Sequence, residues 1–233
     1  MIMRYFTWER YEKMQVRGCL TFHETEEDLL ADKQWYAKEG LNFEERQLES
    51  YKWMEPLIER FIPEELKAAI ARGEGDLLGI HMPAPAFRAK VEAWRSELER
   101  DWENARNSYW ERYKAIESRL PDCRDKLHML HDSIVLDVKA DETAKSIELR
   151  LNASGSMLVH KRILLRFRDV SGHHLTQVEA GDWWLYEELD AGEDGSFELR
   201  ALLDTQKPGR AFSELSITAR SVDYIIEEAA PSL

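Results

Sequence analysis

The fold is decided by residues 87–120, which read FRAKVEAWRSELERDWENARNSYWERYKAIESRL and contain no glycine or proline. Ten apolar or small residues recur there at steps of three and four: Phe87, Val91, Trp94, Leu98, Trp102, Ala105, Tyr109, Tyr113, Ile116 and Leu120. The nine steps average about 3.67 residues, which is a helical period close to that of an eleven-residue repeat. The stretch therefore predicts one long helix, roughly 50 Å from end to end.

The sequence changes character after residue 130, where the apolar period drops to two. Alternating sets predict strands, each with one apolar face. The sets are Ile134, Leu136 and Val138; Ile147, Leu149 and Leu151; Ile163, Leu165 and Phe167; Phe197, Leu199 and Ala201; and Leu215, Ile217 and Ala219. Turn residues separate them, as at Lys207 to Gly209, so we expect an antiparallel meander of six or seven strands. The expected fold class is α+β, with a helical region over residues 1–130 and an antiparallel sheet, sandwich or half-barrel over residues 131–233.

Shorter helices are expected before the long one, because capping residues precede several apolar patterns. Thr25 and Asp28 resemble a capping box, and Asn42 suits the N-cap of a helix that Pro56 is expected to kink or restart. A helix of about 50 Å exceeds the width of a small domain. It is therefore expected to project, to pack along shorter helices or to meet a second copy in a homo-oligomer.

Composition narrows the classes of partner. The net charge of −13 disfavours a phosphate backbone, so nucleic-acid binding is not expected, whereas a basic protein partner is compatible with it. No apolar run is long enough for a membrane span, and the N-terminal residues lack a secretory signal pattern. Cys19 and Cys123 suggest no disulfide framework. We therefore expect a cytoplasmic protein without membrane attachment.

Acidic residues dominate the stretch between Arg168 and Arg200, which contains no lysine or arginine. Its nine acids are Asp169, Glu179, Asp182, Glu187, Glu188, Asp190, Glu193, Asp194 and Glu198. One interpretation pairs them with the basic stretch that includes Lys161, Arg162, Arg166 and Arg168, as complementary neighbouring strands. The others are an acidic face for a basic partner and a divalent-cation site, although the spacing is not that of a calcium loop.

A dense aromatic segment lies inside this acidic stretch: Trp183, Trp184, Leu185, Tyr186, Glu187 and Glu188. In a regular strand, Trp183 and Trp184 point to opposite faces, so one ring is expected in the core. The other ring either packs beneath the helical region or is exposed. Because tryptophan and tyrosine are favoured at interface hot spots, the candidate partner-binding residues are Trp183, Trp184, Tyr186, Glu187 and Glu188.

An alternative to a binding role is a metal-dependent hydrolase, and it depends on the histidines. His128, His131, Asp132 and either His173 or His174 are the candidate ligands of a metal-dependent hydrolase. However, the spacing of His128 and His131 is not that of a zinc-protease helix, and a structural role is the simpler interpretation. No nucleophile elbow or phosphate-binding glycine loop occurs, so neither catalytic residues nor a cofactor are expected.

Several segments together resemble a bacterial family of unknown function: Met3 to Thr7, Tyr11 to Gln15, Thr21 to Thr25, Leu130 to Ser133, Trp183 to Glu188 and Leu202 to Asp204. Members of that family typically begin Met-Lys/Arg-Tyr-Phe-Thr and end with the Trp-Trp-Leu-Tyr-Glu-Glu strand. The C-terminal part is also similar, over a short stretch, to small β domains of bacterial toxin-immunity proteins, which implies a non-enzymatic binding role. The resemblance transfers no catalytic residue. The expected function is thus a cytoplasmic binding protein for a basic partner, with an immunity-like role implied by the second resemblance. The metal-dependent hydrolase and a structural homo-oligomer are the alternatives.

Overall fold

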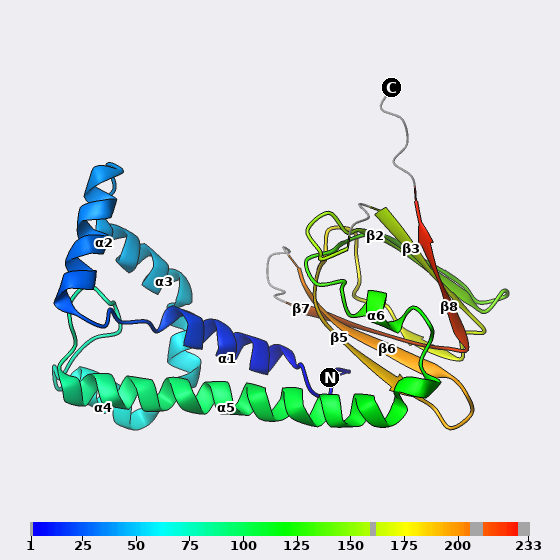
Figure 1. Ribbon diagram of the computed structural model, residues 1–233, viewed down its shortest axis with the longest axis horizontal. Coiled ribbons are helices and arrows are strands. Elements are labelled where there is room, and N and C mark those ends of the chain that lie inside the picture. The colour runs from blue at the N-terminus through cyan, green and yellow to red at the C-terminus, as the bar shows by residue number, and fades with distance from the viewer. Residues whose placement is uncertain (1, 159–161, 206–211, 228–233) are drawn as a thin grey trace. The chain divides into compact units, whose positions relative to one another are not determined.

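The computed structural model describes residues 2–158, 162–205 and 212–227 (Figure 1). By its packing the chain divides into two compact units. One unit is Glu9–Asn104, and the other combines Met1–Trp8 with Ala105–Leu233. This division falls inside the long helix. The expected change from helices to strands near residue 130 is present, since β1 begins at Ile134.

The helices follow the capping signals closely. Their bounds are α1 Trp8–Cys19, α2 Glu26–Lys38, α3 Phe43–Phe61, α4 Glu64–Ala71 and α5 Pro85–Ile116. The predicted capping box is present: the Thr25 hydroxyl accepts from the Asp28 backbone N–H, and the Asp28 carboxylate accepts from the Thr25 N–H. Asn42 accepts from the N–H groups of Glu44 and Glu45. Helix α3 continues through Pro56 without restarting.

The unit Glu9–Asn104 is organised around the first half of α5. The stripe residues Phe87, Val91, Trp94 and Leu98 are buried together with apolar side chains of α1, α3 and α4. The long helix ends slightly earlier than the stripe predicts, because a short 3₁₀ turn, η1 Glu117–Arg119, follows Ile116.

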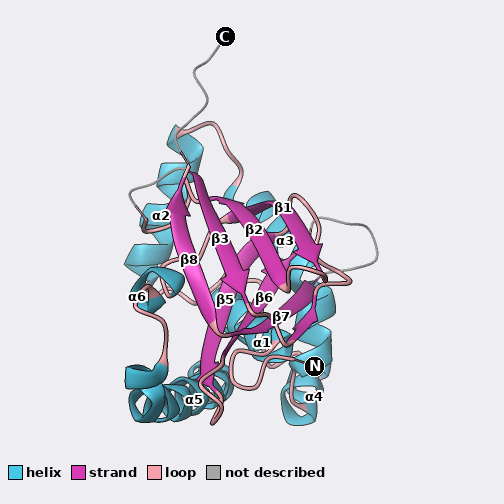
Figure 2. Ribbon diagram, turned by 90° about the vertical axis from the view of Figure 1, so that its right-hand side faces the viewer, coloured by secondary structure: helices cyan, strands magenta, loops and turns pink. Residues whose placement is uncertain are grey.

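The second unit contains an eight-stranded sheet whose strand pairs are all antiparallel, shown as the magenta arrows of Figure 2. After the short helix α6 Arg124–Leu127, the strands are β1 Ile134–Asp141, β2 Ser146–Asn152, β3 Arg162–Arg168, β4 Gly172–His174, β5 Trp183–Ala191, β6 Phe197–Asp204, β7 Phe212–Ala219 and β8 Ser221–Ile226. Their order is β4-β7-β6-β5-β1-β2-β3-β8. The α+β prediction is confirmed, but the expected single meander is not. The runs β1-β2-β3 and β5-β6-β7 are consecutive, whereas β5 pairs with β1, β4 with β7 and β8 with β3. The turn predicted at residues 207–209 lies outside the described residues.

Two halves of this sheet meet at a narrow join. Strands β1 and β5 pair only at Ile134 and Trp183, with flanking backbone hydrogen bonds from Asp132 and Val135. A register shift in β1 between Val135 and Asp137 also breaks the predicted alternation. The expected common apolar face of Ile134, Leu136 and Val138 is therefore interrupted, and Val135 is buried while Leu136 is exposed.

None of the helices in the described parts of the chain combines the length and hydropathy needed to cross a membrane.

Candidate functional site

Strand β5 carries the candidate partner-binding residues at the join of the sheet. Trp183 is 42% exposed, and its indole N–H donates to the Asp132 carbonyl at 3.0 Å. The Trp184 ring is fully buried, as expected for two neighbours on opposite faces. A register shift between Trp184 and Tyr186 then places Leu185 in a bulge. Of the two tryptophans, only Trp183 therefore presents a ring to solvent.

Glu188 is fully buried and holds the N-terminal segment against β5. Its carboxylate accepts from the backbone N–H groups of Arg4 at 3.0 Å, Tyr5 at 2.6 Å and Phe6 at 2.8 Å. Arg200, directly opposite on β6 and also buried, brings Nη1 to 3.7 Å from Glu188 Oε2. A carboxylate in this arrangement is a structural anchor, and its oxygens are engaged inside the fold.

The Glu187 carboxylate also makes its contacts within the fold. Its Oε2 accepts from the Trp184 indole N–H at 2.8 Å, and its Oε1 lies 3.3 Å from His128 Nδ1. Rings of α5 surround the imidazole, with the Tyr113 centroid at 4.9 Å and the Trp110 centroid at 5.7 Å. Here His128 is a packed structural residue, which agrees with its simpler interpretation.

The aromatic cluster also covers the backbone of β5. Tyr109 is buried, and its hydroxyl oxygen accepts from the Leu189 N–H at 2.9 Å. Burial is the main reason that the pKa of the Tyr109 phenol is raised. Tyr109 also contacts the N-terminal segment, since its ring lies edge-on to Phe6 at 5.2 Å, and Phe6 in turn stacks on Tyr186 at 5.6 Å.

The side chains of three arginines lie within 4 Å of the Asp190 carboxylate. Arg112 donates to Oδ1 at 2.7 Å, Arg4 donates to Oδ2 at 2.9 Å, and Arg200 lies 3.9 Å from Oδ2. Burial would raise the pKa of Asp190, but hydrogen bonds from Arg112 and the Ala191 N–H, with the charges of Arg112 and Arg200, lower it overall. The acid is thus held ionised within its own unit.

Asp190 therefore links stability to pH. Because its pKa is lower in the folded chain, the ionised carboxylate stabilises the fold fully above the unfolded pKa, and this contribution is lost as pH falls through the folded pKa. We expect Asp190→Asn to lower stability at neutral pH and to flatten the decline of stability between about pH 5 and about pH 2. Urea unfolding across that range measures both effects, with exposed Asp122→Asn as the control. An acid limb as steep as that of the wild type would contradict the expectation.

The acidic stretch does not pair with the basic stretch, so that prediction is wrong. Strand β3 lies between β2 and β8, not beside β5. Arg166 instead pairs with Glu148 at 2.9 Å, and Arg168 pairs with Asp223 at 2.7 Å. Lys161 lies outside the described residues.

The histidines of the metal hypothesis are not brought together. His131 lies 3.6 Å from Asp132, His173 lies 3.0 Å from Glu142, and His174 approaches Thr176 at 3.5 Å. Within residues 2–158, 162–205 and 212–227, no three His, Cys, Asp or Glu side chains are close enough to hold a metal ion. The structure therefore does not favour the metal-dependent hydrolase.

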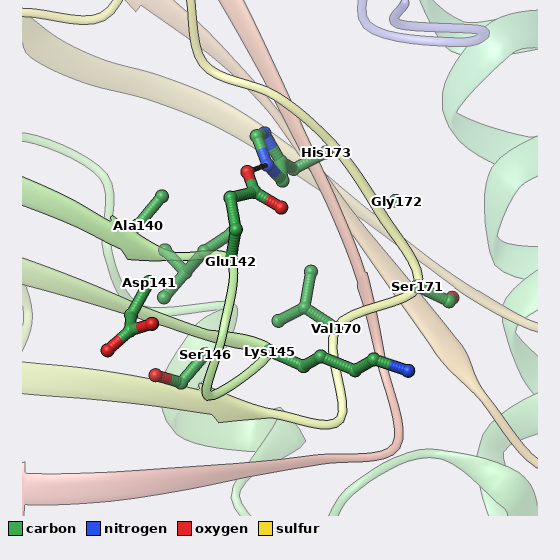
Figure 3. Close-up of a pocket in the computed structure, with 10 residues that line it drawn as sticks. Ala140, Asp141, Glu142, Lys145, Ser146, Val170, Ser171, Gly172 and His173 are labelled. Atoms are coloured by element: carbon green, nitrogen blue, oxygen red, sulfur yellow. Dashed lines mark hydrogen bonds and ion pairs between the residues drawn. The ribbon is translucent and has the colours of Figure 1, made fainter.

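One of these pairs lies in a small polar pocket between the β1–β2 turn and the segment that leads into β4. Figure 3 shows Glu142 pointing toward His173, while the carboxylate of Asp141 points away from them. The cavity measures about 190 Å³, which is below the usual size of a small-molecule site. Its geometry fits a pair that holds two turns together.

The most exposed aromatic ring was missed as a candidate. Trp53 on α3 is 77% exposed, and Trp35 on α2 is 54% exposed. Leu30, Leu41 and Leu48 in the same hairpin are exposed as well. The sequence contains a sign of this exposure, because the apolar residues of 26–38 do not keep to one helical face. In the structure, Leu29 is the only buried residue of α2, all of which is described.

Comparison with protein families places most of the chain in one group. Residues 5–213 match the model of a family described as "Protein of unknown function (DUF4085)". No curated protein matches the chain. The match includes parts of both units and strands β1 to β6, and it confirms the resemblance to an uncharacterised family. The chain belongs to the DUF4085 family of proteins of unknown function.

Proposed function

We propose that the chain is a non-enzymatic cytoplasmic binding protein of bacteria, immunity-like in its role, which engages a basic protein partner. One observation carries the proposal: α2 and α3 expose aromatic and apolar side chains in a segment whose acidic side chains are all exposed as well. We call this region, residues 24–59, the acidic hairpin.

Charge in the acidic hairpin is strongly one-sided. Residues 24–59 contain eleven Asp and Glu against four Lys and Arg, an excess of seven negative charges. All eleven acids are exposed. Lys33 forms an ion pair with Glu44, and Arg46 forms one with Glu49. Most carboxylates of this fully described hairpin therefore form no ion pair with a lysine or arginine of the hairpin. Such a surface attracts a basic partner and repels an acidic one.

The aromatic rings provide the other half of the argument. Tryptophan is the residue most enriched among interface hot spots, and a large apolar ring left in water gains free energy when a partner covers it. Trp53 and Trp35 are exposed in the same hairpin, with Leu30 and Leu48. A basic partner with an apolar stripe matches both features.

Trp183 is the second proposed contact. Of the five candidate residues on β5, it has the most exposed ring, whereas Trp184, Glu187 and Glu188 are engaged inside the fold. A contribution from β5 to partner binding would therefore be made mainly by Trp183.

Binding to defined peptides tests the proposal. The probe is a synthetic amphipathic helix with a leucine face and a lysine face, and the two controls are polylysine of equal charge and the same helix with glutamate for lysine. We expect saturable binding of the leucine–lysine helix, weaker binding of polylysine and none of the glutamate helix. Equal binding of all three, or of none, would contradict the proposal. Tight binding to a basic toxin encoded beside this protein's gene would support the immunity-like role.

Single variants separate the two surfaces. Trp53→Ala is expected to weaken binding of the leucine–lysine helix by at least about tenfold, since a hot-spot truncation costs roughly 2 kcal/mol of binding free energy. Its free energy of unfolding should stay within about 0.5 kcal/mol of the wild type, because the ring is exposed. Titration calorimetry and urea unfolding measure the two quantities, with Trp183→Ala as the matched variant on β5. If Trp183→Ala weakens binding of the helix and Trp53→Ala does not, the binding surface lies on β5 and not on the acidic hairpin.

A further inference from the structure

A second surface feature, distinct from the acidic hairpin, is a pocket in the sheet-containing unit. The segment from η1 to α6 forms one wall, and the start of β8 with Phe197 of β6 forms the other. The cavity measures about 670 Å³, within the range of small-molecule sites. Its lining residues all belong to residues 119–126 and 195–224.

The apolar part of the lining includes two aromatic rings. Phe197 is buried, the Tyr224 ring lies under the Lys126 ammonium at 4.6 Å, and Pro121 adds a rigid apolar edge. The Tyr224 hydroxyl is buried and has no hydrogen-bond partner among the described residues, which leaves a polar group of the fold unused. The pocket therefore places apolar side chains next to polar atoms.

The charged part of the lining is unbalanced. Arg220 forms a hydrogen bond and an ion pair with Asp194, and Asp223 forms an ion pair with Arg168. Arg119 and Lys126 form no ion pair within the described part of the chain, and against them stands one uncommitted acid, Asp122. Positive charge is thus left over in this pocket, although the whole protein carries a net charge of −13.

We propose that this pocket binds a small organic anion, with its carboxylate at Arg119 and Lys126 and an aromatic or branched body against Phe197, Pro121 and Tyr224. Arginine and lysine hold carboxylates through charge-assisted hydrogen bonds, which are stronger than neutral ones. The Cys123 thiol lines the same pocket, and burial raises its pKa, so it stays neutral and does not repel the anion.

Cys123 provides an internal reporter for the test. The other cysteine, Cys19, belongs to the unit Glu9–Asn104, so the Cys19→Ser variant leaves Cys123 as the single thiol. The probe is benzoate, and its neutral counterpart benzamide is the control. We expect benzoate, but not benzamide, to slow the alkylation of Cys123 by iodoacetamide with a saturable dependence on concentration. Ligand-observed NMR of the unmodified protein measures the same binding without relying on the thiol.

Charge variants complete the test. Arg119→Gln and Lys126→Gln, tested one at a time, are each expected to weaken benzoate binding at least about tenfold, as for the loss of a charged hydrogen bond. Lys114→Gln, an exposed residue of α5 outside the pocket, controls for the change in overall charge. Equal binding of benzoate and benzamide, no saturable benzoate binding, or equal weakening by Lys114→Gln would overturn the proposal. None of these outcomes depends on the acidic hairpin.

Discussion

Replacing Trp184 with alanine is expected to lower the free energy of unfolding by about 3–5 kcal/mol, the range for large aromatic residues in a packed core. The ring is fully buried, and its indole N–H donates to Glu187. Truncation would leave a cavity and remove the hydrogen-bond donor to Oε2 of that carboxylate, and both effects destabilise the folded chain. The position adds to the cost, because Trp184 adjoins the single residue pair that joins β1 to β5.

Urea unfolding of Trp184→Ala and Trp183→Ala measures this expectation with a matched neighbour. Trp183 is partly exposed, so its replacement should change the free energy of unfolding far less, with loss of the hydrogen bond to the Asp132 carbonyl as the main cost. Similar losses in the two variants would mean that both rings are structural, and Trp183 would then be withdrawn as a proposed contact for the basic partner.

Local signals in the sequence predicted the helices well. Capping by Thr25 and Asn42 depends on residues two or three positions away, and the stripe of α5 depends on steps of three and four. Such patterns can be read without knowledge of the tertiary fold. Even the missed end of α5, where η1 replaces the last turn, differs by only a few residues.

The strands were predicted less completely, because bulges change which residues face the core. In β1, the shift after Val135 exposes Leu136, and in β5 the shift after Trp184 displaces Leu185. An alternating pattern assumes a constant register, and one extra residue reverses the faces beyond it. The pairing of β8 with β3 could not be predicted either, since no local pattern in the two segments indicates which strands pair.

The candidate site was the least predictable part, because its contacts join distant segments. Arg4 and Arg112 reach Asp190 from the N-terminal segment and from α5, and the backbone of residues 4–6 reaches Glu188. A sequence shows that a stretch is acidic, but it does not show which cations the fold brings to it. Glu187 and Glu188 therefore looked like surface acids, although their carboxylates are engaged in internal contacts.

Glu188→Ala is expected to destabilise the folded chain by about 3–5 kcal/mol, the cost of breaking a buried ion pair. The variant would leave Arg200 buried beside an empty space, with Glu198 as its nearest acid. It would also leave the N–H groups of Arg4, Tyr5 and Phe6 without their acceptor. The N-terminal segment should then detach before the sheet unfolds, because Glu188 is the acceptor that three consecutive amides share.

Two further variants separate the ion pair from the amide acceptor. Glu188→Gln keeps a carbonyl oxygen for the amides but removes the charge, so it should cost less than alanine. Glu188→Leu combined with Arg200→Met removes both charges, which often restores stability at buried pairs, but here the three amides stay unsatisfied. We therefore expect only partial recovery of the free energy of unfolding, together with fast hydrogen exchange at residues 4–6. Full recovery with slow exchange at those amides would show that the N-terminal segment is held by its aromatic contacts, such as Phe6 on Tyr109, and not by the carboxylate.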